Sequence, residues 1–287
     1  MLPELDELTR DELMSLMSKY RLKPSKRLSQ HFVVDPTVIK DMVNHVDAGS
    51  RVLEIGTGIG TLTYYLAKRA SQVITIEVDG RLVKIAERLL GDLRNVSIIQ
   101  GDALRLPWPQ VDIVVSNVPY SITSALIIRI IREGAPKVLL TIQREVANRL
   151  VSEPGGDDYG RLTVITRCNY NVALLNTYTP EAFYPSPEVY SSLVMMVRRE
   201  PCYQNLEELE LVTNMLFRHR NRVLRWVLNK YLGSEALNDV VKGGIDVGLR
   251  VRQLGVDDIV SITKILRPYM GRLKTVIGTL NIDYDTH

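Results

Sequence analysis

The stretch RVLEIGTGIG, residues 51–60, places three glycines directly after a short apolar run. An apolar run that ends at glycine predicts a buried strand, and the helical pattern at 61–70 completes a strand–loop–helix unit. Glycines in such a loop allow a tight turn and bring backbone N–H groups close to a ligand at the helix N-terminus. The glycine loop is therefore the first candidate binding element of the chain.

Predicted strands and helices alternate along the chain around this loop. Strand patterns lie at 51–55, 73–77, 96–99, 112–116 and 137–142, and helical patterns lie between them at 61–70, 80–90 and 122–133. This alternation predicts an α/β fold with a mostly parallel sheet and helices on both faces. Segments 161–167 and 189–198 also have strand character with no long helix between them, so we expect an antiparallel end to the sheet.

The chain changes character after about residue 200. Residues 199–206, REPCYQNL, are the best linker candidate, and helical patterns follow at 207–217, 219–231 and 256–268. We therefore expect one domain over residues 1–200, with a basic N-terminal extension, and a small helical domain over residues 201–287. A chain of 287 residues with 45% apolar and 24% charged residues is long enough to bury a full core.

Cysteine, histidine and hydropathy patterns exclude several classes of protein. The two cysteines, Cys168 and Cys202, are too few for a disulfide framework or a four-ligand zinc site, and we expect a reducing compartment, the cytoplasm. Residues 1–20 carry acids and no apolar run, so they do not resemble a signal peptide, and no apolar stretch is long enough to span a membrane. The four histidines, at positions 31, 45, 219 and 287, are scattered, so we expect no metal site.

Basic residues gather in two segments, although the net charge is only +3. Residues 19–40 contain six basic residues and one acid, and residues 218–230 contain five basic residues, one histidine and no acid. Such clusters neutralise nucleic-acid phosphates, but they are as often a solvated surface. The sequence leaves both interpretations open for each cluster taken alone.

Three acidic residues stand at the ends of predicted strands, where open α/β sheets bind their ligands. Glu77 ends the second strand and can accept from both hydroxyls of a ribose, and Asp102 follows the third strand and can accept from an adenine amine. Glu54, just before the glycine loop, suits a cationic ligand and would repel a pyrophosphate. Each acid alone can be a solvated strand end. Together with a glycine spacing that lacks the third glycine of GxGxxG, they favour an adenosyl cofactor over a dinucleotide.

The tetrapeptide Asn117-Val118-Pro119-Tyr120 follows the fourth predicted strand, at the same edge of the sheet. The lone pair of an adenine N6 amine is delocalised into the ring, and acceptors for its N–H groups would localise that pair toward a methyl donor. Asn117 offers an amide oxygen, the Val118–Pro119 backbone offers a carbonyl, and Tyr120 offers a ring on which a flipped-out base can stack. An Asn/Pro turn that merely ends a strand is the alternative interpretation.

These segments resemble the KsgA family of small-subunit ribosomal RNA adenine dimethyltransferases. The resemblance covers about residues 19–200 continuously and the remainder more loosely. It is carried by SQHFVVD at 29–35, EIGTGIG at 54–60, Glu77, Gly101-Asp102, NVPY at 117–120, QREVANRL at 143–150, YGRL at 159–162 and FYPSPEV at 183–189. The basic preface YRLKP at 20–24 is most similar to the archaeal branch of the family.

The resemblance implies a Rossmann-like class I methyltransferase domain, with a mostly parallel seven-stranded sheet that ends antiparallel, and a small α-helical C-terminal domain. It implies S-adenosylmethionine as cofactor and dimethylation of two adjacent adenosines near the 3′ end of small-subunit RNA, on an assembling subunit. The implied cofactor contacts are Gln30, His31, Val33, Glu54, Gly56, Gly58, Glu77, Asp102 and Asn117. At the target base it implies Asn117 and Pro119 beside the amine, with Tyr120 and Phe183 sandwiching the ring.

The helical domain and the basic segments are expected to bind the RNA. The expected RNA contacts are Lys23, Lys26, Arg27, Arg144, Arg218, Arg220, Arg222 and Arg225. Two alternatives remain: an adenine N6-methyltransferase that acts on another RNA or on DNA, and a ribosome-assembly factor that does not methylate. The intact glycine loop, Asn117 and Tyr120 favour an enzyme, and a dehydrogenase is a more distant alternative. We further expect the protein to be a monomer.

Overall fold

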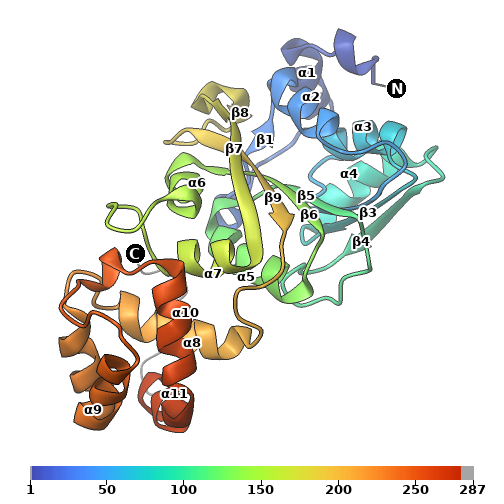
Figure 1. Cartoon of the computed structure of the whole chain (residues 1–287). Coiled ribbons are helices and arrows are strands. Elements are labelled where there is room, and N and C mark those ends of the chain that lie inside the picture. The colour runs from blue at the N-terminus through green and yellow to red at the C-terminus, as the bar shows by residue number, and fades with distance from the viewer. Residues whose placement is uncertain (1, 279–287) are drawn as a thin grey trace. The chain divides into compact units, whose positions relative to one another are not determined.

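The chain divides into two compact units. Unit 1 comprises Met1–Ala147 and Ala173–Arg198, and unit 2 comprises Asn148–Val172 and Arg199–His287. A computed structural model describes residues 2–278 of the chain (Figure 1). The sequence predicted one boundary near residue 200, but the chain passes between the units three times, and residues 148–172 belong to the helical unit. Residues 279–287 of the expected second domain, including His287, lie outside the described residues.

The central sheet has seven strands in the order β4-β3-β2-β5-β6-β9-β7 (Figure 1). The neighbouring strands from β4 to β6 are parallel, and β9 is antiparallel to β6. The strands are β2 (Arg51–Ile55), β3 (Gln72–Glu77), β4 (Val96–Gln100), β5 (Ile113–Asn117), β6 (Lys137–Gln143), β7 (Tyr170–Tyr178) and β9 (Ser191–Arg198). The predicted parallel sheet with an antiparallel end is confirmed.

One predicted strand is wrong. Residues 161–167 form most of α7 (Arg161–Asn169), and the strand that completes the sheet, β7, follows it. The run from Thr163 to Thr166 is β-branched, which favours a strand by local preference. The helix forms because Gly160 and Thr163 cap its start and because Val164 and Cys168 pack into the core of unit 2.

Helices fill the connections of unit 1. They are α1 (Arg10–Lys19), α2 (Pro36–Asn44), α3 (Thr61–Arg69), α4 (Gly80–Leu90) and α5 (Thr123–Glu133), and α6 (Arg144–Val151) leads out of the unit. A second, two-stranded sheet pairs β1 (Phe32–Val33) antiparallel with β8 (Phe183–Tyr184). This pairing fixes the N-terminal segment beside the loop that precedes β9, and both border the site described below.

Unit 2 is helical. Besides α7 it contains α8 (Leu206–Phe217), α9 (Leu224–Lys242), α10 (Val256–Ile265) and α11 (Met270–Gly278), which share one apolar core. Helix α9 is interrupted at Gly233, whose φ of 83° lies in the left-handed region that glycine tolerates. The helix predicted from residue 219 begins only at Leu224, because the preceding residues pair with another segment through the bridge between Val223 and Arg250.

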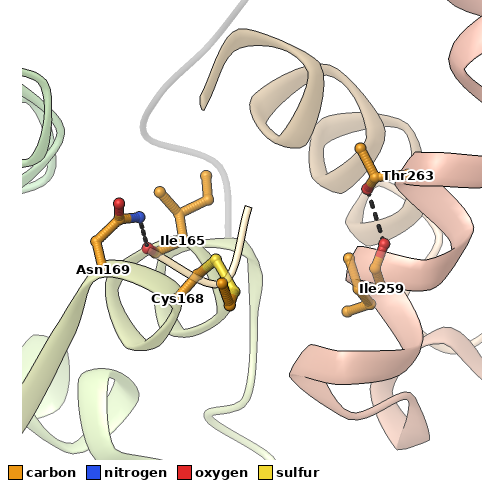
Figure 2. Close-up of a disulfide and its surroundings, with 6 residues drawn as sticks. Ile165, Cys168, Asn169, Ile259 and Thr263 are labelled. Carbon is orange, nitrogen blue, oxygen red and sulfur yellow. Dashed lines mark hydrogen bonds between the residues drawn. A yellow bond between two sulfur atoms is a disulfide. The ribbon is translucent and has the colours of Figure 1, made fainter. Parts of the chain in front are cut away.

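A disulfide joins Cys168 to Cys202, with their Cα atoms 5.0 Å apart. Figure 2 shows the bridge at the end of α7, where the Asn169 amide also donates to the Ile165 carbonyl at 2.8 Å. Two cysteines are too few for a framework but sufficient for one bridge, which the expectation of a reducing compartment did not anticipate. The bridge connects the two chain segments that make up unit 2.

We expect reduction of this disulfide to lower the thermal stability of the protein. The bridge closes a loop of 34 residues, and a constraint of that length on the unfolded chain stabilises the folded state by about 3–4 kcal/mol. Treatment with a reducing agent should therefore lower Tm by about 10 °C. The Cys202→Ser variant should melt at the lower temperature with or without the reductant. Alkylation of both cysteines in the untreated, denatured protein would contradict the bridge.

Candidate active site

A cavity of about 240 Å³ opens at the carboxyl ends of β2, β3 and β5, within unit 1. Apolar side chains of Phe32, Ile76 and Leu82 line part of it. Of the residues expected from the sequence, the cavity is lined by Gln30, His31, Gly56, Gly58, Glu77, Asp102, Asn117, Pro119 and Tyr120. The structure therefore brings together residues that lie up to 90 positions apart in the sequence.

The glycine loop forms one wall of this cavity. Gly56, at φ 84°, and Gly60, at φ 91°, adopt the left-handed conformation that glycine tolerates best. At Gly60 an added Cβ would lie 2.9 Å from Leu90 Cδ1, so a side chain there would also collide with α4. The N–H of Gly58 donates to Glu77 Oε2 at 2.9 Å. This bond fixes the loop after β2 to the end of β3.

Two carboxylates face the ligand side of the cavity. Glu77 is 6% exposed, and its Oε1 accepts from the N–H of Asp79 at 2.9 Å. Burial raises the pKa of Glu77 above its ordinary value, while the backbone N–H donors of Asp79 and Gly58 act in the opposite direction. Asp102 is more open: its Oδ1 accepts from the N–H of Leu104 at 2.9 Å, and its Oδ2 lies 3.3 Å from Nε of the exposed Arg105. Both groups keep lone pairs for ligand hydroxyl or amine donors.

The segment before β1 closes the cavity from another side. The Gln30 amide oxygen accepts from the N–H of Ser25 at 2.8 Å, and its Nε2 donates to Asp79 Oδ2 at 3.3 Å. The side chain of Arg81, which bonds the same carboxylate, lowers the pKa of Asp79 to about 2. Gln30 thus lines the cavity while its amide positions this segment. Asp79 was not predicted from the sequence, although its position as the N-cap of α4 could have identified it.

A smaller cavity of about 60 Å³ lies behind the glycine loop, and Val33, Glu54 and Asn117 border it. Glu54 is 1% exposed, and its Oε2 accepts from the Thr63 hydroxyl at 2.5 Å. Its Oε1 has no hydrogen-bond partner of good geometry within the described chain. Burial raises the pKa of Glu54 from 4.5 to about 7. A buried carboxylate with one unpartnered oxygen is suited to a cationic ligand group, which would stabilise its charged form.

Asn117, the last residue of β5, has its side chain oriented by a hydrogen bond. Its Nδ2 donates to the carbonyl oxygen of His31 at 2.8 Å. Because the donor end of the amide is used in this way, Oδ1 is left as an acceptor. The N–H of Val118 donates to the Thr141 carbonyl at 3.0 Å and fixes the backbone that follows.

Tyr120 presents an aromatic ring to the same cavity. Its hydroxyl lies 2.6 Å from Ser191 Oγ, and its ring stacks on the imidazole of His31, with ring centroids 5.1 Å apart. The His31 Nδ1 in turn lies 2.7 Å from the Pro185 carbonyl. Ser191, which holds Tyr120, was not identified from the sequence because it lies 71 residues away along the chain.

Phe183 is not placed as the sequence predicts. Its side chain is 1% exposed and belongs to the core of unit 1, so in this conformation its ring has no free face for a base. The reason is the pairing of β1 with β8, which sets Phe183 opposite Val33. Its neighbour Tyr184 is 40% exposed. The geometry gives Tyr120, and not Phe183, as the available stacking ring.

The expected RNA contacts fall into groups with different surroundings. Lys23, Lys26 and Arg27 are exposed and form no ion pair with a described carboxylate. Arg144 is also exposed, and its guanidinium lies 4.6 Å from the ring centroid of Tyr190. In unit 2, Arg218, Arg222 and Arg225 are exposed, although Arg218 also bonds to Asn214, and the half-buried Arg220 bonds to the carbonyl oxygen of Asp157.

Between residues 2 and 278 no group of three or more His, Cys, Asp or Glu side chains is arranged to hold a metal ion. Over the same range, no helix is both long and apolar enough to cross a membrane.

The chain is similar to known proteins over most of its length. The family described as ribosomal RNA adenine dimethylase matches residues 21–267. The probable ribosomal RNA small subunit methyltransferase A of Pyrobaculum aerophilum is 49% identical over 201 residues, which cover 70% of this chain and 86% of the relative. The protein of the same name from Thermococcus gammatolerans is 33% identical over 265 residues, which cover 90% of this chain and 95% of the relative.

Two solved structures share the fold. A dimethyladenosine transferase from Plasmodium falciparum superposes with a TM-score of 0.74 at 23% identity, over 84% of this chain and 98% of that one. The 23S rRNA methyltransferase ErmE superposes with a TM-score of 0.62 at 27% identity, over 82% of this chain and 99% of that one. Both agree with the Rossmann-like fold. On its sequence match and its fold together, the chain belongs to the ribosomal RNA adenine dimethylase family.

Proposed function

We propose that this protein transfers methyl groups from S-adenosylmethionine to the N6 amines of two adjacent adenosines near the 3′ end of small-subunit ribosomal RNA. The observation that carries the proposal is the orientation of Asn117, whose amide donates to the His31 carbonyl and keeps Oδ1 as an acceptor at the cavity. That arrangement suits an amine as the group to be methylated.

The residues around the two cavities fit S-adenosylmethionine. Glu77 and Asp102 provide acceptors for ribose hydroxyls and an adenine amine, and the glycine loop allows close approach of the ligand. The unpartnered oxygen of the buried Glu54 suits the positively charged end of the cofactor. When bound, this cofactor supplies an electrophilic methyl group on a sulfonium sulfur.

The protein's part in the reaction is to position the amine. Asn117 Oδ1 accepts from one N–H of the adenine amine and holds the nitrogen lone pair toward the methyl donor. The backbone after Asn117 offers a carbonyl for the second N–H. No general base is needed, because the methylated nitrogen loses its proton to water.

Tyr120 holds the target base by stacking. Its hydroxyl is fixed by Ser191, so the ring is set in place before the base arrives. In the free protein His31 stacks on this ring, and the incoming base either displaces the imidazole or uses the opposite face. Any base can stack on an aromatic ring, so Tyr120 holds the base, and the acceptor of Asn117 selects a base that carries an amine.

The substrate is proposed from the curated relatives, which are named as small-subunit methyltransferases. We propose that the protein acts on an assembling small subunit in the cytoplasm, as a monomer, and takes part in subunit biogenesis. The likeness to ErmE, a 23S rRNA methyltransferase, makes large-subunit RNA the second candidate substrate. A non-methylating assembly factor would not require the oriented Asn117 amide.

The test of this function is methyl transfer from labelled S-adenosylmethionine to small subunits that lack adenine dimethylation, followed by digestion of the RNA to nucleosides. We expect labelled N6,N6-dimethyladenosine from two neighbouring positions. Label on large-subunit RNA alone would establish the second candidate. Absence of label from a protein that binds both cofactor and subunit would leave the assembly factor.

Asn117→Ala is expected to lower the rate of methyl transfer by about 10²-fold or more, because the amine loses its main acceptor. Cofactor affinity, measured by calorimetry, should remain close to that of the parent. Asn117→Asp keeps an acceptor oxygen and should retain more activity than the alanine variant. Asn95→Ala is the matched control, since its amide bonds the carbonyls of Ala67 and Ala70 outside the cavity. Loss of cofactor binding in Asn117→Ala would mean that Asn117 binds the cofactor and not the target amine.

Glu54→Gln is expected to stabilise the free protein above neutral pH. A carboxyl whose pKa is raised by folding holds its proton more tightly when folded, so folding stability falls as pH rises from 4.5 to about 7. That rise in pKa corresponds to roughly 3 kcal/mol, which a neutral amide avoids. By calorimetry the variant should melt above the parent at about pH 8, and the two should melt alike at about pH 4, below the ordinary pKa of the carboxyl.

The same variant is expected to bind S-adenosylmethionine more weakly. In the parent, affinity should increase as pH rises through about 7, because Glu54 ionises and attracts the cationic end of the ligand. In Glu54→Gln this pH dependence should be absent. Glu210→Gln, at a buried glutamate of unit 2, is the matched control and should change neither property. Equal pH profiles in the parent and in Glu54→Gln would remove Glu54 from the cofactor site.

A further inference from the structure

The basic segment from Arg218 to Lys230 does not act as a single patch. The Nε of Arg218 donates to Asn214 Oδ1 at 2.8 Å. Arg220 donates to the carbonyl oxygens of Gly156 and Asp157, at 3.1 and 2.7 Å. Arg220 therefore holds two chain segments of unit 2 together, whereas the Arg218 bond is local, to a residue four positions earlier. Both side chains are engaged in this way, so the part of the segment that remains available for a ligand is narrower than the sequence suggests.

Three cations of the segment remain available. Arg222, Arg225 and Lys230 are exposed, and none forms an ion pair with a carboxylate in the described part of the chain. All three lie within nine residues, at or next to the first turns of α9. Uncompensated cations on one short stretch form an electrostatic site for phosphates.

An exposed tryptophan stands among these cations. Trp226 is 38% exposed, and its ring centroid lies 5.2 Å from the Arg222 guanidinium carbon and 4.8 Å from Lys230 Nζ. The His219 ring meets it almost at a right angle, at 78° and 5.0 Å. Val223, also 38% exposed, adds apolar surface in the same segment. Tryptophan is usually buried for most of its area, so this exposed ring between two cations suits a ligand that is both aromatic and anionic.

A nucleotide has this combination of properties. Its base can stack on the indole, and the phosphates on either side of it can contact the flexible side chains of Arg222 and Lys230. A base inside a duplex is covered on both faces by its neighbours, so the nucleotide must be unpaired. An acidic peptide would satisfy the cations but would bring no planar base to stack on the exposed indole.

We propose that Trp226, Arg222 and Lys230 form a second nucleotide-binding site, on unit 2, that takes an unpaired nucleotide of the substrate RNA outside the methylation cavity. This proposal rests on the proposed function only in taking RNA as the substrate. The site contributes RNA affinity and placement, and it takes no part in methyl transfer.

Trp226 fluorescence reports directly on this site. The chain contains only two tryptophans, Trp108 and Trp226, so Trp108→Phe leaves a single reporter. We expect an unstructured single-stranded RNA oligonucleotide to quench its emission, because a stacked base contacts the indole face. A duplex of the same sequence should quench it far less.

Binding and kinetics supply the second measurement. Trp226→Ala should raise the Kd for the single-stranded RNA about tenfold, whereas Trp226→Phe, which keeps a stacking ring, should retain most of the affinity. Arg222→Gln and Lys230→Gln should each reduce the slope of affinity against salt by about one. Val241→Ala and Lys242→Gln, exposed positions at the other end of α9, are matched controls and should change neither quantity. In methylation of small subunits, Trp226→Ala should raise KM and leave kcat unchanged.

Two results would overturn the proposal. The first is an unquenched Trp226 together with an unchanged Kd for RNA in Trp226→Ala. The second is that Trp226→Ala binds subunits more weakly but binds RNA alone as tightly as the parent, and that RNA does not quench Trp226 fluorescence. This result would identify a ribosomal protein as the partner. Failure of the proposed function would be distinguishable from failure of this site. In that case the wild-type protein would not methylate small subunits, whether or not RNA quenches Trp226 fluorescence.

Discussion

The hydrogen bond from the Asn117 amide to the His31 carbonyl is the interaction on which the active site depends. It joins the end of a central strand to the N-terminal segment, across 86 positions of sequence. From His31 the contacts continue to Tyr120 through ring stacking and to Pro185 through Nδ1. One amide thus leaves its oxygen as an acceptor at the cavity and fixes the N-terminal segment that lines it.

Local patterns predicted most of the sheet and most of the cavity. The apolar strands and the helical periodicity between them are short-range features, and parallel strands bring their carboxyl ends to one edge of a sheet. Glu77, Asp102 and Asn117 could therefore be placed together without coordinates. The helix over 161–169 could not be predicted in this way, because its β-branched run forms a helix only through packing in unit 2.

The surroundings of some predicted site residues depend on contacts distant in sequence. The burial of Phe183 follows from strand pairing with residues about 150 positions earlier, and composition carries no sign of that pairing. The bonds of Arg220 go to the carbonyl oxygens of Gly156 and Asp157, which only the fold brings within reach. A cluster of basic residues in a sequence therefore predicts a positively charged surface. The structure is needed to separate the cations that are exposed to solvent from those that bond to other parts of the chain.

The division of unit 2 into two chain segments has a consequence for engineering. Residues 148–172 interrupt unit 1 and contribute α7 to the core of unit 2. The disulfide joins this segment to the second segment of unit 2, which begins at Arg199. Truncation after residue 200 would therefore not yield an isolated catalytic domain, since it would expose the apolar face of α7. A chimera that exchanges RNA-recognition modules between relatives must carry both segments together, with their paired cysteines, across three splice junctions.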